Sequence, residues 1–424
     1  MQAPKKSICL ATVKSEITRE EALKGTVDRV VGLFEDIRLG VRNLGVFSSS
    51  VSLRESISRA GCEGLILLVG TGGTESIIYG VLRDLNIHTL LVAYEGLNSL
   101  PAMLEAHAAL VSEGRKWVNS VFLELSKIRE SREALVDALK PLFAVLSMRG
   151  ARIGVIGRPS PWLIYSRAGK ADVKELFGAE LIDIPIERLA ALYERAEAPE
   201  REVEGLASVA TPRITREHIR MALKLYYAIK ELVRDYSLSA VTVECFRVAE
   251  MLGVTPCYAL ARLNSEGVDA GCEGDVPSLL TLMLLRRLSD QPAMMGNVAS
   301  IRDGDLTLAH CTAPLNLATS FLLDTHMETG LGVGVTARLP TGRQVTVAKL
   351  DTRKKRIVAL TGRIVESGML SPRLCRTQVV IKTNRRLSRL LEDPVGAHMV
   401  LTIGNVLDQL RTASRLIAVD LVEV

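Results

Sequence analysis

The sequence predicts an α/β protein with two doubly wound parallel-sheet domains, followed by a C-terminal β-rich, barrel-like domain. Strand and helix patterns alternate over the first 150 residues, which favours a parallel sheet covered on both faces. A second alternating stretch starts at Arg152. After residue 295 the apolar segments are short, β-branched and separated by turn residues, which is typical of antiparallel structure. Because 424 residues exceed one ordinary domain, we expect domains at 1–149, 150–294 and 295–424.

The expected elements of the first domain follow from the spacing of apolar residues. Strands are expected at residues 7–13, 64–69 and 88–94. Helices are expected at residues 20–39, 74–85 and 100–112. The apolar pattern from residue 119 to residue 148 predicts one long helix that leads out of this domain.

The remaining two domains differ in the order of their elements. In the second, strands are expected at residues 153–156, 181–184 and 240–245, and a helix at 215–235. The charged, proline-punctuated stretch 187–216 predicts an exposed helical excursion, and a helix, an acidic turn and another helix lead to Asp290. In the third, strands are expected at residues 306–309, 332–339, 344–350, 356–365 and 377–382, before a helix at 406–416 and a strand at 417–422.

The composition excludes several classes of protein. Hydrophobic residues make up 48% of the chain and charged residues 24%, as in globular proteins. Only 4% of residues are aromatic, which argues against binding of single-stranded nucleic acid through stacked bases. The net charge of +5 is spread among interleaved acids, so no nucleic-acid partner is expected.

The apolar runs and the cysteines indicate a cytoplasmic protein. The longest apolar runs fall well short of the roughly 20 residues that a membrane span requires. A strand-like segment follows the N-terminal residues without an apolar leader, so we expect no membrane partner and a cytoplasmic location. The seven cysteines are scattered and form no Cys-x-x-Cys pair, so most are expected to be reduced, buried thiols.

Three loops could face a ligand. Gly70 to Glu75 lies between a strand and a helix but lacks the Lys-Ser/Thr ending of a phosphate-binding loop, and a tight turn of small residues explains it equally well. Asn98 to Ala102 reads first as a capped helix start. Gly157 to Trp162 places Arg158 and Trp162 after a strand, where open α/β sheets bind ligands, although a structural Trp is an equal alternative.

The richest segment for chemistry runs from Thr242 to His310. Glu244 is an acid in an apolar strand, and such an acid must be paired, hydrogen-bonded or metal-bound unless it faces the surface. Glu273 and Asp275 open a helix after a small-residue turn, where Asp275 alone could be an N-cap. A lone histidine such as His310 is more often a core residue than a ligand. Carboxylates together with an imidazole suit a hard divalent cation, so the cluster predicts a metal or sugar site.

The same residues resemble the L-fucose/L-arabinose isomerase-like superfamily, most of all its short fucose-isomerase-like branch. The resemblance covers nearly the whole chain, and its more specific stretches are Gly271-Cys-Glu-Gly-Asp275 and Leu308-Ala-His-Cys-Thr312. The other matching stretches are 71–75, 98–102, 157–163, 253–257, 264–267, 328–332 and 375–378.

The resemblance implies a metal-dependent aldose–ketose isomerase that acts on an open-chain sugar through an enediol. It implies manganese or a similar divalent ion, and a homotrimer or homohexamer with active sites between subunits. The candidate catalytic residues are then Glu244 and Glu273, and the candidate metal ligands are Glu244, Glu273, Asp275, His310 and His398. The candidate substrate-binding residues are Thr71, Gly72, Gly73, Asn98, Arg158 and Trp162.

Two departures from the family pattern leave alternatives open. Gly396-Ala397-His398-Met399 resembles a Gly-X-His-His stretch, but Met399 replaces the second histidine, so His310 or His398 could supply the imidazole. The residues around Glu244 match poorly. A non-catalytic sugar-binding or regulatory protein on the same scaffold is therefore the main alternative. A nucleotide-binding oxidoreductase is disfavoured because the chain lacks Gly-x-Gly-x-x-Gly followed by a ribose-binding acid.

Overall fold

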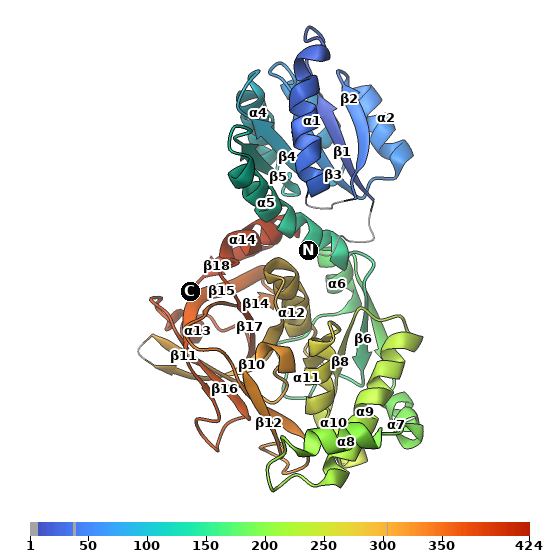
Figure 1. Ribbon diagram of the computed structural model, residues 1–424, viewed down its shortest axis with the longest axis vertical. Coiled ribbons are helices and arrows are strands. Elements are labelled where there is room, and N and C mark those ends of the chain that lie inside the picture. The colour runs from blue at the N-terminus through green and yellow to red at the C-terminus, as the bar shows by residue number, and fades with distance from the viewer. Residues whose placement is uncertain (1–6, 37–39, 303) are drawn as a thin grey trace. The chain divides into compact units, whose positions relative to one another are not determined.

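The computed structural model describes residues 7–36, 40–302 and 304–424, which fall into two compact units (Figure 1). The first unit holds the chain up to Arg149 together with Asp408–Val419. The second holds Gly150–Leu407 and Asp420–Val424. The three-domain division predicted from the sequence stays a prediction.

The first unit is built on a five-stranded parallel sheet with the strand order β2-β1-β3-β4-β5. Its strands are β1 (Ile8–Val13), β2 (Arg42–Phe47), β3 (Gly64–Val69), β4 (His88–Tyr94) and β5 (Val118–Leu123). Its helices are α1 (Glu21–Asp36), α2 (Ser50–Ala60), α3 (Glu75–Leu82), α4 (Ser99–Ser112), α5 (Ile128–Met148) and most of α14 (Leu407–Leu416).

Both faces of this sheet are buried, as the doubly wound prediction requires. Alternate residues of β1 enter two separate cores, because successive side chains of a strand point to opposite faces. Cys9 and Ala11 pack with residues of α2, α3 and α4, whereas Ile8 and Leu10 pack with residues of α1 and α5. The doubly wound fold predicted for this part of the chain is therefore confirmed.

The single long helix predicted at residues 119–148 is wrong. Val118–Leu123 is strand β5, which pairs with β4 in parallel register from Thr89↔Val118 to Tyr94↔Leu123. The helix α5 begins only at Ile128. An open sheet edge takes up the alternating Val-Asn-Ser-Val-Phe-Leu segment, so tertiary pairing overrides the local helical pattern. The end of the helix predicted at residues 20–39 lies outside the described residues.

The second unit contains a four-stranded parallel sheet with the order β7-β6-β8-β9. The strands are β6 (Arg152–Ile156), β7 (Glu180–Ile184), β8 (Ala240–Val243) and β9 (Asp269–Cys272). The helices are α6 (Lys170–Phe177), α7 (Ile186–Arg195), α8 (Glu200–Ala207), α9 (Arg216–Asp235), α10 (Cys245–Leu252), α11 (Cys257–Ser265) and α12 (Val276–Ser289). The predicted helical excursion is confirmed as α7 and α8, whereas β9 replaces part of the helix–turn–helix expected before Asp290.

The same unit closes with an antiparallel β-barrel. The strands are β10 (Ala293–Arg302), β11 (Asp305–His310), β12 (Ser320–Asp324), β13 (Gly334–Arg338), β14 (Gln344–Asp351), β15 (Arg356–Gly368), β16 (Thr377–Lys382), β17 (His398–Ile403) and β18 (Asp420–Glu423). The barrel runs β14-β17-β10-β11-β16-β15, and pairing of β15 with β14 closes it. The β18 strand adds in parallel to β15, and β12 pairs with β13 outside the barrel. A short 3₁₀ turn (Leu315–Leu317) and the helix α13 (Arg389–Glu392) lie in its connections. The predicted barrel-like C-terminal region is confirmed.

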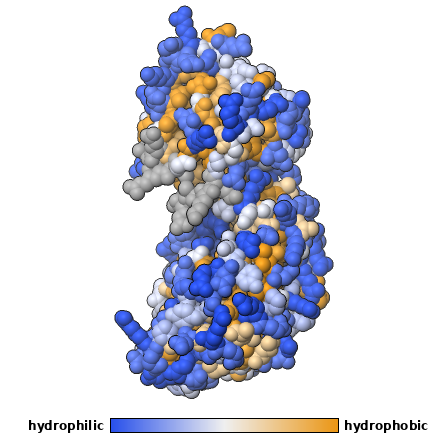
Figure 2. Space-filling model, turned by 90° about the vertical axis from the view of Figure 1, so that its right-hand side faces the viewer, coloured by the Kyte–Doolittle hydropathy of each residue, from blue (hydrophilic) through white to orange (hydrophobic). Residues whose placement is uncertain are grey.

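The cysteines and the helices bear on two further expectations. Cys9 and Cys62 form a disulfide in the first unit, while the other cysteines, in the second unit, are free thiols. Across the described ranges, each helix is too short or too polar to cross a membrane. The surface of Figure 2 mixes hydrophilic and hydrophobic side chains.

His88 gives the first unit a pH-dependent stability. Its Nε2 lies 3.0 Å from the Leu416 carbonyl oxygen, and burial together with the charge of Arg149 lowers its pKa to about 4. In the unfolded chain the same imidazole takes up a proton near pH 6.5. Below that pH the unfolded state binds a proton that the folded state refuses, so stability falls as the pH drops from 6.5 to about 4.

We expect His88→Gln, which keeps a donor for the carbonyl but does not titrate, to flatten this pH dependence. The difference in slope should approach about 1.4 kcal/mol per pH unit between pH 6 and pH 5. The chain has two tryptophans, so a Trp162→Phe background leaves Trp117, which lies in the first unit. Its fluorescence during urea unfolding therefore reports on the stability of the first unit. Equal slopes for the two proteins would contradict this account.

Candidate active site

The site begins where two neighbouring strands of the second unit end. Glu244 follows β8 and Glu273 follows β9, and the last residues of these strands, Val243 and Cys272, are paired in parallel register. Carboxyl ends of parallel strands are where open α/β sheets bind ligands. The turn after β9 is unusual, because Glu273 and Gly274 have φ angles of 61° and 68°. Such a conformation is uncommon in a residue other than glycine.

The loop from Gly157 to Trp162 holds this turn. The Ser160 amide donates to the Glu273 carbonyl oxygen at 2.8 Å, and Trp162 Nε1 donates to Glu273 Oε2 at 2.6 Å. A Cβ on Gly274 would lie 2.6 Å from Pro159 Cα, so only glycine allows this close approach. The Trp162 ring meets Phe246 edge-on, with ring centroids 4.8 Å apart. The structure therefore brings Trp162 and Glu273 together.

Asp275 is fully buried, and all of its hydrogen-bonding capacity is used. It accepts from the Ser278 amide at 2.8 Å, from Lys349 Nζ at 2.9 and 3.0 Å, and from His398 Nδ1 at 2.9 Å. Burial alone would raise the pKa of Asp275, but Lys349 and His398 outweigh it and keep the pKa below its usual range. Asp275 thus caps α12 and holds His398, and its predicted role as a direct metal ligand has no support in this geometry.

The structure brings both candidate histidines to Glu273. His398 opens β17 and His310 ends β11, and both strands flank β10 beside Asn297. The two ring centroids lie 5.6 Å apart. His398 Nε2 is buried without a hydrogen-bond partner in the described structure and lies 3.7 Å from Glu273 Oε1. Nδ1 of His310 lies 2.9 Å from Thr312 Oγ1.

Electrostatics keep Glu273 ionised and His310 neutral. Burial would raise the pKa of Glu273, but the contact with His398 and the Trp162 N–H lower it. Burial and the neighbouring His398 lower the pKa of His310 to about 3. A carboxylate and a neutral imidazole are the states in which Glu273 and His310 would bind a metal. Burial would lower the pKa of His398, but Asp275 and Glu273 outweigh it and raise that pKa, so His398 would lose its proton to a bound ion.

These groups border a small, partly open pocket of about 30 Å³. Its lining residues are Cys245, Phe246, Ala249, Thr255, Cys257, Cys272, Glu273, Asn297, His310, Cys311, His326, Glu328, Thr329 and Cys375. Burial and the charge of Glu273 raise the pKa of Glu328, so the pocket holds two carboxyl groups of opposite tendency.

Sequence reasoning did not name Asn297, Glu328 or Lys349 as site residues. Glu328 opens one of the stretches that match the isomerase superfamily, and Lys349 is a cation in an apolar strand, so both carried a signal. Asn297 carried none, because β10 was not foreseen.

Glu244 and Arg158 lie on a different opening. The Arg158 amide donates to Glu244 Oε2 at 2.8 Å, and both residues line a surface cleft with Arg247 and Asp183. The Glu244 carboxylate turns toward Gly157, where a Cβ would meet Oε2 at 2.5 Å. Its predicted roles as metal ligand and catalytic base stay predictions.

The four candidate residues of the first unit gather at the carboxyl edge of its sheet. Thr71 Oγ1 accepts from the Ser15 amide at 2.8 Å, and the Gly72 amide donates to the Leu97 carbonyl at 2.7 Å. A Cβ on Gly72 would lie 2.8 Å from Asn98 Cβ, and Gly73 has a φ of 75°. These contacts explain the small residues by close packing of two loops, so substrate binding there stays a prediction.

The donors around Glu273 fit a divalent metal. The unpartnered, buried Nε2 of His398 points to a missing ligand, and Asp275 on Nδ1 is the outer carboxylate that orients metal-binding imidazoles. Cys272, Glu273 and His310 offer ligand atoms within 4.8 Å of one another, so this group combines a thiol with oxygen and nitrogen donors. The oxygen and nitrogen donors are of the type that suits manganese.

Comparisons with known proteins give relatives that share one name. No family model matches the chain. The sulfoquinovose isomerase of Alkalicoccus urumqiensis is 24% identical over 322 residues, and the match covers 69% of each chain. Those of Clostridium sp. (strain MSTE9) and Priestia aryabhattai are 24% and 20% identical, over 62% and 68% of each chain. The aligned part thus spans about two thirds of these relatives' length.

These relatives confirm the resemblance to the L-fucose/L-arabinose isomerase-like superfamily that the sequence motifs indicated. Within it, the proteins to which this chain is similar carry the name sulfoquinovose isomerase.

Lys349→Met should destabilise the second unit strongly, because it leaves Asp275 as an uncompensated buried charge. Loss of one partner of a buried pair costs about 3–5 kcal/mol. The double variant Asp275→Asn/Lys349→Met should recover part of this loss. Lys354→Met, at an exposed pair with Asp393, is the matched control and should change stability little. Urea unfolding followed by circular dichroism measures all three, and a Lys349→Met protein as stable as the control would refute the account.

Proposed function

We propose that this chain is an aldose–ketose isomerase whose reaction takes place in the pocket around Glu273, His310 and His398. The isomerase class rests on relatives that bear the name sulfoquinovose isomerase. The observation that carries the site is the ionised Glu273 carboxylate, which lies 3.7 Å from the unpartnered Nε2 of buried His398.

In this proposal Glu273, His310 and His398 hold a divalent ion, which we expect to be manganese. Such an ion stabilises, as a Lewis acid, the negative charge that develops on the sugar oxygens when the carbon-bound proton leaves. The role of this chain is to present the three donors in fixed orientations. Asp275 and Lys349 fix the His398 ring, and Trp162 fixes the Glu273 carboxylate.

Moving a proton between C1 and C2 through an enediol requires a group that removes the proton and returns it. Glu273 and Glu328 are the two carboxyl groups of the pocket. Their pKa values are shifted in opposite directions, an arrangement that suits a base and an acid partner. Glu244, the partner inferred from the sequence, is bound to the Arg158 amide instead, so Glu328 takes that role in this proposal.

The substrate class follows from the relatives and from the loop beside the pocket. Their printed name makes a sulfonated sugar the first candidate, with deoxy and unmodified aldoses next. Arg158 is exposed on the loop that holds Glu273 but lines the separate cleft beside Glu244, so its predicted contact with an anionic substituent stays a prediction. Trp162 keeps half of its surface exposed (51%) beside the Glu273 carboxylate, a place where a sugar ring can pack.

The alternative of a non-catalytic sugar-binding protein arose from Met399, which stands where the family pattern has a second histidine. Met399 is fully buried and follows His398 directly on β17. Adjacent residues of a strand face opposite sides, so Met399 points away from the side that His398 presents to Glu273. Its presence therefore removes no donor from this pocket, which favours the enzyme.

The assembly and location implied by the family belong to the same proposal. We expect a homotrimer or homohexamer in the cytoplasm, with active sites between subunits. Sedimentation of the purified chain measures the oligomer directly.

Glu273→Gln should reduce turnover by at least about 10²-fold, because it removes both a metal donor and a proton acceptor. Ketose formation is assayed with manganese on sulfonated, deoxy and unmodified aldoses. Glu366→Gln, on an exposed barrel position, is the control for losing a carboxylate. Full activity of Glu273→Gln with a normal circular dichroism spectrum would sink the assignment.

Removal of divalent ions should abolish the isomerase activity, and manganese should restore it. Without the ion, no Lewis acid remains in the proposed donor set to stabilise the charge that develops on the sugar oxygens. The measurement compares turnover after dialysis against a chelator with turnover after adding back manganese or magnesium. Undiminished turnover in the metal-free protein would contradict the metal-dependent mechanism.

A further inference from the structure

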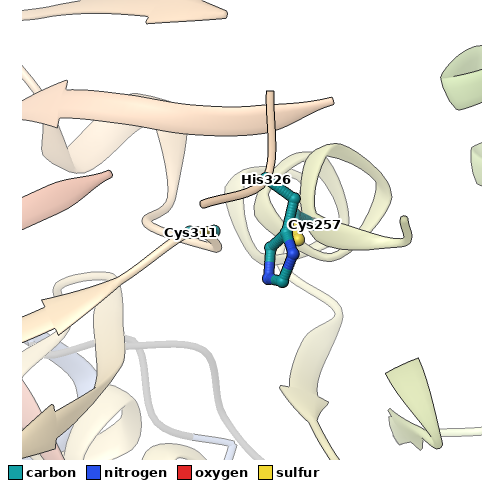
Figure 3. Close-up of side chains that lie close together, drawn as sticks. All are labelled: Cys257, Cys311 and His326. Carbon is teal, nitrogen blue, oxygen red and sulfur yellow. The ribbon is translucent and has the colours of Figure 1, made fainter. Parts of the chain in front are cut away.

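A second group of ligand-type side chains lies in the pocket wall, apart from the Glu273 donors. Cys257, Cys311 and His326 each offer a ligand atom, and these atoms lie within 4.8 Å of one another (Figure 3). All three residues are buried. The thiol of Cys375 interacts with that of Cys311 and lines the same pocket. Cys257, Cys311 and His326 thus form a close group, to which Cys375 is joined through its contact with Cys311.

We propose that Cys257, Cys311, Cys375 and His326 bind a soft divalent metal, zinc, as a Cys₃His site. Three thiolates and an imidazole are a common donor set of structural zinc sites. Ligand atoms around a tetrahedral zinc ion with such donors lie about 3.7 Å apart. The spacing of at most 4.8 Å among Cys257, Cys311 and His326 therefore needs a contraction of about 1 Å or less.

The imidazole is already oriented for this role. His326 Nδ1 lies 3.1 Å from Thr329 Oγ1 and accepts from the Thr329 amide at 3.4 Å, so Thr329 fixes the ring. Binding of a metal at Nε2 would move the ring proton to Nδ1, where Thr329 Oγ1 can accept it. Phe246 contacts the ring, with centroids 5.6 Å apart. Metal-binding histidines are typically held in this way through their second nitrogen.

The neighbouring thiols and burial raise the pKa values of Cys311 and Cys375, so thiolates in this cluster require a bound cation. Three thiolates and one zinc ion carry a net charge of −1. Arg376, which follows Cys375 directly, is buried and donates from Nε to the carbonyl of Thr325, next to His326. A buried guanidinium beside two of the four ligands offsets that charge.

The two groups of donors in this pocket differ in chemical hardness. Glu273 and the two histidines near it offer oxygen and nitrogen, which suit manganese, whereas sulfur selects zinc. The cysteine site would join the start of α11, the end of β11, the end of β12 and the start of β16. These elements are far apart in sequence, so the ion would fix the pocket wall in the way that structural zinc sites fix small folds.

The test is cobalt substitution of the full-length chain purified under reducing conditions. Bound cobalt should give the near-ultraviolet charge-transfer band of cobalt–thiolate bonds with one equivalent of metal, and zinc should displace it. Cys311→Ser and His326→Gln should weaken the binding of cobalt at least tenfold. Cys245→Ser is the matched control, because Cys245 lines the same pocket outside the cluster and should leave the band unchanged.

The proposal can be tested even if a variant folds poorly, because the wild-type protein itself must show the cobalt–thiolate band. Absence of the band in reduced wild-type protein overturns the site. So does a band that Cys272→Ser removes and Cys311→Ser leaves, which would place the thiolate at the Cys272–Glu273–His310 group. A Cys311–Cys375 or Cys257–Cys311 disulfide that forms in place of bound zinc, found by mass spectrometry, also overturns it. The result does not depend on isomerase activity, since Glu273→Gln should keep the band.

Discussion

A buried ion pair between Asp275 and Lys349 organises the second unit. The aspartate starts α12 after the parallel sheet, and the lysine comes from β14 of the barrel, so the pair ties the two parts of this unit together. Removing two charges from water is favourable only when each is fully satisfied. Asp275 meets that condition through Lys349, the Ser278 amide and His398. The His398 ring is therefore oriented by one of the hydrogen bonds that the buried Asp275 carboxylate needs.

Much of the fold could be predicted from local patterns, and the failures have physical causes. The elements β1, α1, β3, α3, β4 and α4 and the turn-rich barrel carried clear periodicity, whereas α2 was not predicted. The β5 segment failed, because an open sheet edge captured residues whose apolar spacing also suits a helix. The strands β9 and β17 were missed because their pairing partners are distant in sequence, and β2, β10 and β12 were missed because no local pattern marks them.

The candidate site was predictable in part for a related reason. The Cys272–Asp275 stretch marks the site through residue types, but not which carboxylate faces the pocket. Which carboxylate faces the pocket depends on Lys349, which is 74 residues away from Asp275 and forms a buried ion pair with it. For the same reason His310 and His398 could not be ranked from the sequence, whereas the barrel register places both beside Asn297. The position of the Glu244 carboxylate could not be predicted either, because it accepts a hydrogen bond from the Arg158 backbone amide.

The path of the chain through the two units also shapes the way the protein is made. Residues 408–419 belong to the first unit, although a ribosome synthesises them after nearly all of the second. Until Leu416 has emerged, His88 lacks the carbonyl that it contacts, and β15 lacks its neighbour β18 until a few residues later. Neither unit can therefore finish folding during most of translation. During most of translation, the hydrophobic cores of both units are therefore incomplete. A truncation near residue 407 would leave both units without their last elements.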